Sequence, residues 1–523
     1  MSKIKRNGTK PQVLSAREAV EYIADQDTVA VSGAGGGIVD PYALINALHE
    51  RYVETGCPKN LTLWHSTGLG DRNDRGMSPL ALEGLVKRVI GGHWGQSPRL
   101  AEMASENKIE AYNFPQGIMA QLARTAAAGQ PGILSHVGLG TFIDPRVSGG
   151  KLNEVSQEDL IRVMNVDGKE WLYYPVVPLD VCLIRATTAD TEGYASMEEE
   201  ITYIDVLQLA QAVHNNGGTV ILQVKRLVKA GTLHPKSVKI PGFLVDAIVV
   251  EEKQEQLYNG SDRFFSGDYI ADDSAVTMLP LDQRKVVARR ALMEVRPGYV
   301  GNVGVGIADG IGNVAREEGV QDAFTLTVET GPVGGATAQG IFFGATVNAR
   351  AVMDMPAQFD FYDGGGLDVA FLSFAELDEN GDVNVHHFNG KIMGTGGFVN
   401  IVAGSKKVVL CGTLRAGKLL TEIRDGKITI QQEGRIKNVS SVTFSAKQAE
   451  KQKQEVIYIT ERAVFKLMNG KVVLTEIAPG IDVQKDVIDQ MGFVPEIAED
   501  LKETDARIFR EEKMNIYNEF INQ

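Results

Sequence analysis

The chain of 523 residues carries a net charge of −14, with 43% hydrophobic and 23% charged residues, an ordinary globular composition that excludes disordered, collagen-like and mucin-like chains. The acidic total disfavours nucleic-acid binding, because phosphate neutralisation needs a basic face. No apolar run reaches the roughly 18 residues of a membrane span, and the basic N-terminus lacks the apolar segment of a signal peptide, so we expect a soluble, cytoplasmic protein.

Helical and strand patterns alternate through the first hundred residues. A helix is predicted at 15–26, because Ser15 can serve as its N-cap and Glu18, three residues later, completes a capping box. The pattern continues with a strand at 28–33, a helix at 41–56, a strand at 60–66, and further elements within 81–94 and 97–108. This βαβ rhythm predicts a parallel sheet with helices on both faces.

Internal repeats indicate a duplication. Similar segments are found at 15–35 and 283–306, at 60–70 and 323–334, at 181–195 and 369–383, and at 220–222 and 408–410. The last two pairs share one offset, 188 residues, whereas the first pair is offset by 271. The first copy therefore contains additional residues, and 153–175 is expected to supply much of this excess.

The duplication predicts the domain organisation. We expect an α/β protein built from two homologous open, twisted-sheet domains, residues 1–275 and 276–523, with the active site between them. The polar, turn-rich stretch 251–280 is expected to link the two halves.

Several common site motifs are absent or incomplete. The glycine cluster at 33–37 follows a strand, but Ile38 stands where the third glycine of a GxGxxG dinucleotide fingerprint belongs, and Asp309 interrupts a second candidate. The histidines form no ligand-spaced set, and we predict no catalytic metal. The three cysteines are isolated, which argues against a disulfide framework; they are Cys57, Cys182 and Cys411.

The two copies differ at one strand end. The first has Ser66-Thr67-Gly68, whereas the second has Glu329-Thr330-Gly331 followed by further glycines up to 335. A carboxylate at a strand end faces the cleft of such a sheet, and glycines leave backbone N–H groups free to bind anions. The alternative is an ordinary exposed turn glutamate. The glycine clusters at 363–368 and 393–400 likewise fit either ligand-facing backbone or plain turns.

A family resemblance rests on motifs that span nearly the whole chain. They are TLTVETGPVGG (325–335), DFYDGGGLD (360–368), GTGGFVNI (394–401) and ITERAVF (459–465) in the second half, and GGHWGQSP (91–98), AYNFPQG (111–117) and GTFIDPR (140–146) in the first. Together they resemble the class I (glutamate-dependent) CoA-transferases, and most of all the single-chain acetate/propionate type. In that family, two homologous α/β halves enclose the active site, which agrees with the duplication.

The resemblance implies roles for individual residues. Glu329 corresponds to the catalytic nucleophile, Gln116 to the glutamine that donates to the oxyanion, and Gly396 and Gly397 to the partner loop of the oxyanion site, with the inward-pointing amide left open. Glycine loops and neighbours corresponding to the CoA- and substrate-binding positions are Gly33, Gly35, Gly36, Gly37, Val333, Gly334, Gly364, Gly365 and Gly366.

The resemblance also implies the chemistry and the partners. CoA would pass from a short-chain acyl-CoA to a short-chain carboxylic acid by ping-pong kinetics, through an acyl-glutamyl anhydride and a glutamyl-CoA thioester. CoA is then a substrate moiety, no cofactor is permanently bound, and a homotetramer is expected. Basic residues that could neutralise the CoA phosphates, or simply be solvated surface cations, are Lys225, Arg226, Lys229 and Lys236.

Other functional classes stay open on the sequence alone. A short-chain acyl-CoA hydrolase would use the same glutamate and admit water to the intermediate. A non-catalytic ligand-binding protein would have no need of a glutamate in one copy only. A nicotinamide-dependent oxidoreductase is disfavoured by the incomplete glycine fingerprints.

Overall fold

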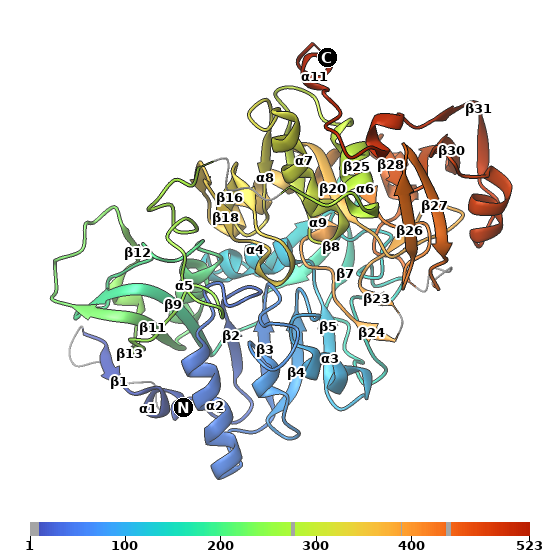
Figure 1. Cartoon of the computed structure of the whole chain (residues 1–523). Coiled ribbons are helices and arrows are strands. Elements are labelled where there is room, and N and C mark those ends of the chain that lie inside the picture. Colours follow the sequence, from blue (N-terminus) through green and yellow to red (C-terminus); the bar gives the residue numbers. More distant parts are fainter. Residues whose placement is uncertain (1–9, 273–277, 389, 436–440, 523) are drawn as a thin grey trace.

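The computed structural model describes residues 10–272, 278–388, 390–435 and 441–522. Two ten-stranded sheets dominate it, one in each half of the sequence. In Figure 1 the first half, blue to green, lies below the second half, yellow to red, and helix α4 lies between them. No helix in the described ranges has the length and apolar character needed to cross a membrane.

The first sheet has the strand order β1-β13-β11-β9-β2-β3-β4-β5, and every neighbouring pair along it is parallel. Its strands are β1 (Gln12–Leu14), β2 (Thr28–Val31), β3 (Leu61–His65), β4 (Val86–Gly91), β5 (Glu110–Asn113), β9 (Val181–Asp190), β10 (Ala195–Ser196), β11 (Thr219–Val228), β12 (Val238–Ile240) and β13 (Ala247–Val250). The helices of this half are α1 (Ala16–Val20), α2 (Tyr42–Thr55), α3 (Pro98–Ser105), α4 (Gln116–Ala127) and α5 (Val206–Asn215).

The second sheet has the order β19-β16-β15-β14-β20-β25-β28-β29-β30-β31. Its strands are β14 (Val300–Val303), β15 (Thr325–Thr327), β16 (Pro332–Val333), β19 (Ala351–Val352), β20 (Leu367–Ser373), β25 (Ser405–Cys411), β28 (Glu455–Ile459), β29 (Ala463–Met468), β30 (Lys471–Ile477) and β31 (Glu496–Glu503). The helices are α6 (Gln283–Leu292), α7 (Ile311–Glu318), α8 (Met355–Asp363), α9 (Phe398–Gly404), α10 (Ala446–Lys451) and α11 (Tyr517–Ile521).

Smaller sheets complete both halves. A three-stranded sheet in the first half contains β6 (Gly132–Ser135), β7 (Arg162–Val166) and β8 (Lys169–Pro175). Two-stranded sheets in the second half pair β17 (Ala336–Thr337) with β18 (Thr346–Val347), β21 (Glu376–Leu377) with β22 (Val383–Asn384), β23 (His387–Phe388) with β24 (Lys391–Ile392), and β26 (Leu420–Arg424) with β27 (Lys427–Gln432).

The strand order confirms the predicted α/β duplication. The run β13-β11-β9-β2-β3 in the first sheet is matched by β28-β25-β20-β14-β15 in the second. Val181 pairs with Thr219, and the residues 188 positions later, Val369 and Lys407, pair in the same way. The 188-residue offset therefore relates two equivalent strand pairs that have the same register.

The additional residues of the first copy form two insertions. Residues 153–175 contain the antiparallel β7-β8 pair, as part of the three-stranded sheet. Strands β4 and β5 with helix α3 form a second addition, because the second half has only short strands and α8 between β15 and β20. The segment singled out in the sequence thus accounts for part of the excess.

The predicted capping box of the first helix is present, but the helix is shorter than expected. Ser15 Oγ accepts a hydrogen bond from the Glu18 backbone N–H at 3.3 Å, and the Ser15 N–H donates to the Glu18 carboxylate at 2.8 Å, so the predicted capping box is present. The helix, however, ends at Val20 rather than near residue 26. Residues 251–272 consist of turns and bends, and they pack on the first half through the Tyr258 N–H, which donates to Gly36 O at 2.8 Å.

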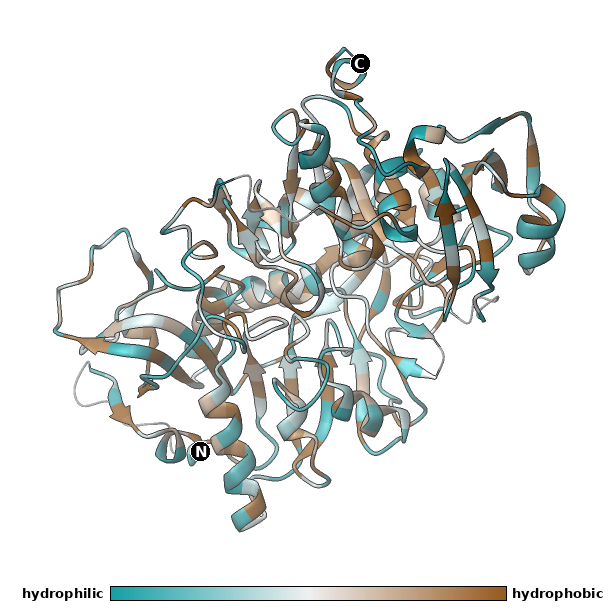
Figure 2. Cartoon of the chain, viewed as in Figure 1, coloured by the Kyte–Doolittle hydropathy of each residue, from teal (hydrophilic) through white to brown (hydrophobic). Residues whose placement is uncertain are grey.

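Buried apolar side chains join the two halves. One cluster includes Ile118 of α4 together with Phe359 of α8 and Val399 of α9, so the interface between the halves is part of a continuous core. In Figure 2 the outer helix α2 shows both apolar and polar colours along its length. The elements that meet at this interface are therefore fixed relative to one another by packing.

Candidate functional site

Glu329 lies in a tight turn between β15 and β16. The Gly331 N–H donates to Val328 O at 2.9 Å, and the Val328 N–H donates to Pro332 O at 3.0 Å. Gly331 has a φ of +129°, and a Cβ there would collide with Met353 O, so glycine is needed for this turn. The turn is also held from the first half, since Thr202 Oγ1 donates to Thr330 O at 2.5 Å.

The carboxyl group of Glu329 has an unusual environment. Its Oε2 atom is buried and has no hydrogen-bond partner within the described part of the chain. Burial raises the pKa of Glu329 to about 7, and hydrogen bonds from its own backbone N–H and from the Asn302 side chain offset this only in part. A poorly solvated carboxylate of this kind is reactive when it is ionised.

Glu329 lines a cavity of about 300 Å³ between the two halves. The first half contributes Ala34, Gly35, Thr67, Gly68, His93, Gln96 and Gln116, and the second contributes Gly304, Val305, Glu329, Thr330, Phe343, Leu372, Ser373, Phe374, Ala375, Val385, Met393, Gly394, Thr395, Gly396, Gly397, Phe398 and Ile401. Of the residues predicted from sequence, the structure brings Glu329, Gln116, Gly396, Gly397 and Gly35 together here.

Gln116 is the first residue of α4 and is 4% exposed. Its backbone N–H donates to Gly396 O at 3.0 Å, which fixes the start of the helix against the second half. Its side-chain Nε2 lies 3.3 Å from Met355 Sδ. A thioether is a weak acceptor, so this amide donor can be turned to a stronger acceptor in the cavity.

Gly396 and Gly397 form the turn before α9. The Gly396 N–H donates to Gly92 O at 2.8 Å, which ties this turn to the first half as well. A Cβ at Gly397 would lie 3.3 Å from Glu329 Cγ and 3.0 Å from Phe359 Cζ, so the backbone passes directly beside the carboxylate side chain. Helices α4 and α9 both begin at this place, and the positive ends of their dipoles favour negative charge there.

The other predicted glycine positions lie outside the cavity lining. Gly33, Gly36 and Gly37 serve close packing instead: a Cβ at Gly33 would lie 2.9 Å from Leu69 Cδ2, one at Gly36 2.8 Å from Phe342 Cδ1, and one at Gly37 2.9 Å from Tyr258 N. Val333 pairs with β19 within the sheet. Gly334 lines a separate cavity of about 210 Å³ with Arg316 and Arg350.

The cluster Gly364, Gly365 and Gly366 also lies outside the cavity lining. It connects the end of α8 to the beginning of β20, whereas Ser373 at the far end of that strand lines the cavity. Gly365, with a φ of +85°, closes the helix–strand turn.

Two cavity residues have no role implied by the sequence, although their motif, GGHWGQSP, contributes to the family resemblance. His93 Nδ1 and Gln96 Oε1 are buried and lack hydrogen-bond partners among the described residues. Burial, aided by Arg72 and His65, lowers the pKa of His93 to about 4, so the imidazole is neutral at physiological pH. Residue spacing cannot reveal that a buried polar atom lacks a hydrogen-bond partner, because this depends on the tertiary surroundings of the atom.

A buried carboxylate holds two of the loops that line the cavity. Asp205 accepts hydrogen bonds from Ser32 Oγ at 2.8 Å and from Ser66 Oγ at 2.6 Å. These serines directly follow β2 and β3. The ends of both strands, and with them Ala34 and Thr67 beyond, are therefore anchored to the start of α5.

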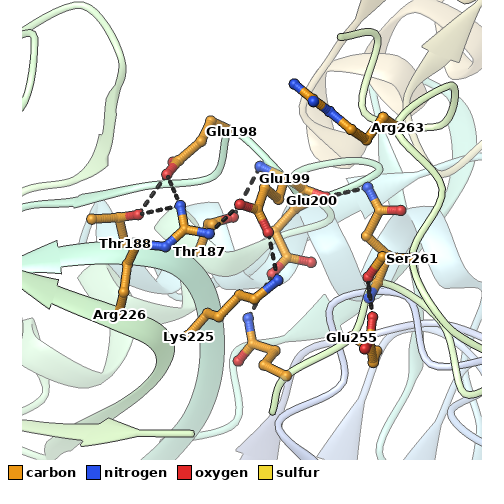
Figure 3. A network of polar contacts seen from close by, with 12 residues as sticks. Thr187, Thr188, Glu198, Glu199, Glu200, Lys225, Arg226, Glu255, Ser261 and Arg263 are labelled. Carbon is orange, nitrogen blue, oxygen red and sulfur yellow. Dashed lines mark hydrogen bonds and ion pairs between the residues drawn. The ribbon is translucent and has the colours of Figure 1, made fainter. Parts of the chain in front are cut away.

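Two of the basic residues considered for the CoA phosphates are already paired. Figure 3 shows Lys225 and Arg226 beside the glutamates that follow β10. Lys225 Nζ lies 2.9 Å from Glu199 Oε2, and Arg226 pairs with both Glu198 and Glu199. Lys229 and Lys236 are exposed.

No group of three or more potential metal ligands is found among the described residues, in which the cysteines are free thiols.

Comparison with known proteins identifies the family. Residues 13–251 match the family model described as Coenzyme A transferase. The chain is 60% identical over 509 residues to acetate CoA-transferase YdiF of Escherichia coli (strain K12), covering 96% of each chain. It is 43% identical over 512 residues to caffeate CoA-transferase of Acetobacterium woodii, covering 95% of this chain and 97% of the relative.

Solved structures agree. The apoenzyme of the acyl-CoA transferase YdiF from E. coli O157:H7 superposes with a TM-score of 0.94 at 58% identity, covering 98% of this chain and 99% of that one. A structure of the same protein described as a thioester complex with CoA matches equally well. The chain therefore belongs to the class I coenzyme A transferase family. It is a CoA-transferase, an enzyme that transfers CoA to carboxylic acids, as the resemblance predicted.

Proposed function

We propose that the protein moves CoA from a short-chain acyl-CoA, such as acetyl-CoA, to a short-chain carboxylate, with Glu329 as the covalent catalyst. The observation that carries this proposal is the buried Glu329 carboxyl group in the cavity between the halves, whose Oε2 has no hydrogen-bond partner among the described residues. A carboxylate is a weak nucleophile toward a thioester in water, and it gains reactivity when it is desolvated and held against the carbonyl carbon.

The reaction proceeds through two covalent forms of Glu329. Its carboxylate attacks the thioester carbonyl, the C–S bond breaks, and CoA thiolate and an acyl-glutamyl anhydride result. The thiolate then attacks the γ-carbonyl of Glu329, the anhydride C–O bond breaks, and the first carboxylate leaves behind a glutamyl-CoA thioester. A second carboxylate reverses these steps. Thioester energy is kept throughout, and the sequence of steps gives ping-pong kinetics.

Each attack creates an oxyanion that needs preorganised donors. Gln116 Nε2, which contacts Met355 Sδ, and the backbone amide of Gly397 border the same cavity as Glu329, whereas the Gly396 N–H already donates to Gly92 O. The beginnings of α4 and α9 add their dipoles. These groups stabilise the tetrahedral intermediates on both the acyl carbon and the γ-carbon of Glu329.

The cavity walls differ in character. The second half presents large apolar side chains, including Val305, Phe343, Leu372 and Phe374, while the first half presents mostly small or polar residues. The apolar wall suits the pantetheine arm of CoA, whose binding energy can be used at the remote reacting bond. A volume of about 300 Å³ favours short acyl chains. A CoA thioester in the 58%-identical YdiF structure supports the assignment.

The test is intact-protein mass spectrometry after incubation with acetyl-CoA and no acceptor acid, with wild type beside Glu329→Ala. We expect a covalent adduct of CoA less one water on the wild type only, discharged by added propionate with formation of propionyl-CoA. Absence of the adduct while propionyl-CoA is still formed contradicts the covalent mechanism. Discharge by water as fast as by propionate assigns hydrolysis instead of transfer.

The pKa of Glu329 predicts the pH dependence. The group must be ionised to attack, and its raised pKa of about 7 keeps it protonated in acid. We expect kcat/KM for acyl-CoA to rise about tenfold per pH unit below pH 7 and to level off above it. His93, with a pKa near 4, stays neutral over this range. A profile measured from pH 5 to 9 that is flat between 5 and 7 contradicts this prediction.

Location and assembly are part of the same proposal. By analogy with the family, we infer a cytoplasmic homotetramer without a permanently bound cofactor. Light scattering of the purified protein tests the assembly, with an expected mass about four times the 56.7 kDa of one chain. A monomer or dimer would contradict it.

A further inference from the structure

A buried amide side chain connects the two oxyanion elements. Asn400 lies in the first turn of α9, three residues after Gly397, and is 0% exposed. Its Oδ1 accepts a hydrogen bond from the Gly117 backbone N–H at 3.0 Å. Its Nδ2 donates to both oxygens of Asp363, at 3.0 and 3.1 Å. One side chain thus bridges α9 and α8 of the second half and α4 of the first.

The bridge ends next to the proposed oxyanion donor. Gly117 follows Gln116 at the start of α4. Asn400 Oδ1 accepts from the Gly117 N–H, and Gly396 O accepts from the Gln116 N–H. Both acceptors belong to the turn and helix that carry Gly397. The first N–H groups of a helix have no partner within it, and here the second half of the protein supplies both. The position of Gln116 relative to Gly397 is therefore set by these two hydrogen bonds.

The bridge has little freedom to shift. A Cβ at Gly117 would lie 2.6 Å from Asn400 Nδ2 and still closer to the Phe359 ring. The anchor is fixed as well, because Asp363 also accepts from Gln121 Nε2 at 2.9 Å. Helices α4 and α8 are joined again where Arg124 pairs with Asp360.

We propose that Asn400 is a positioning residue. It fixes the start of α4 relative to the Gly396–Gly397 turn, so that hydrogen-bond donors from both halves point to one oxyanion. The proposal rests on the function proposed above. Asn400 is not among the residues that line the cavity, so it acts through Gln116 and Gly397 rather than on the substrate. A misplacement of about 1 Å at a catalytic group can cost about 10²-fold in rate.

The principal test compares Asn400→Leu with a matched control, Gln223→Met. Gln223 is also 0% exposed, and it likewise accepts a hydrogen bond from a helix start, that of Ala43 in α2 at 3.0 Å, while donating to Gln254 at 2.8 Å. Gln223 is not a cavity residue. We expect both variants to lose thermal stability, but only Asn400→Leu to lose about 10²-fold in kcat, with KM for acyl-CoA changed less than about threefold.

A second variant keeps the inference testable if Asn400→Leu does not fold. In Asn400→Asp the introduced carboxyl and Asp363 are close enough to share one proton, because two adjacent carboxylates resist joint ionisation. The protonated form preserves the bridge, as it accepts from Gly117 and donates to Asp363. Other charged or titratable groups near Asp363 are Asp360, Arg124 and Tyr174. We expect the ratio of variant to wild-type kcat to fall at least tenfold between pH 6 and 9.

The outcomes separate this inference from the proposed function. If wild type forms no CoA adduct, the proposed function fails. If wild type forms it and Asn400→Leu forms it at the same rate, the positioning role is overturned. Equal losses of kcat in Asn400→Leu and Gln223→Met, or a pH-independent ratio for Asn400→Asp, also overturn it.

Discussion

Glu329→Gln is expected to abolish CoA transfer, with a loss of at least about 10⁴-fold in kcat. The amide has nearly the same shape as the carboxylate but cannot attack a thioester, so the covalent route is closed while the cavity is kept. Propionyl-CoA formation from acetyl-CoA and propionate, followed by chromatography, measures the loss. Glu329→Asp, which withdraws the carboxylate by one methylene, should retain a small activity and a slow adduct. Residual transfer by Glu329→Gln above about 0.01% of wild type contradicts the assignment.

The same substitution should stabilise the protein at alkaline pH. The folded pKa of Glu329 is raised from 4.5 to about 7, so between these values the folded state binds more protons than the unfolded state. Wild-type stability therefore falls as pH rises through this window. Glutamine removes the buried charge, and we expect a gain on the order of 2–3 kcal/mol at pH 8 that disappears near pH 4.5. Thermal unfolding of both proteins at the two pH values tests this, and a gain that is equal at both contradicts it.

The fold was predictable because its signals are periodic and repeated. The 188-residue offset became the common register of β9 with β11 and of β20 with β25. The position of Glu329 in the cavity was predictable for a related reason: the duplication aligns it with Ser66, so the difference between the copies marks a position where one half departs from the shared scaffold.

The composition of the site was predictable only in part. The glycines of residues 33–37 and 364–366 are as dense as those at 394–397, yet only Gly35 of the first two clusters lines the cavity. A glycine is required wherever backbone passes close to another atom, whether that atom belongs to a ligand or to the protein itself. Sequence density cannot separate these two causes, whereas packing distances do.

Contacts between distant segments were beyond sequence reasoning. Asn400 and Gly117 are separated by 283 residues and meet only because α4 lies between the two sheets. Asp205 is separated from Ser66 by 139 residues and carries no motif of its own. Neither partner has a composition or spacing that signals the other, so these supports of the site emerge only from the tertiary arrangement.

Gln116→Met is expected to lower kcat by about 10²–10³-fold, the usual effect of removing one oxyanion donor. Methionine matches the length of glutamine and suits the contact with Met355, and the backbone hydrogen bond to Gly396 O needs no side chain, so the fold should be retained. KM should change little, because the donor acts mainly on the transition state. Steady-state kinetics test this beside Gln223→Met, whose kcat should stay within about twofold of wild type. Because Glu329 is intact, the glutamyl-CoA adduct should still form, only more slowly. A variant with normal kcat and raised KM would instead make Gln116 a ground-state binding residue, and the oxyanion would then depend on the backbone amide of Gly397.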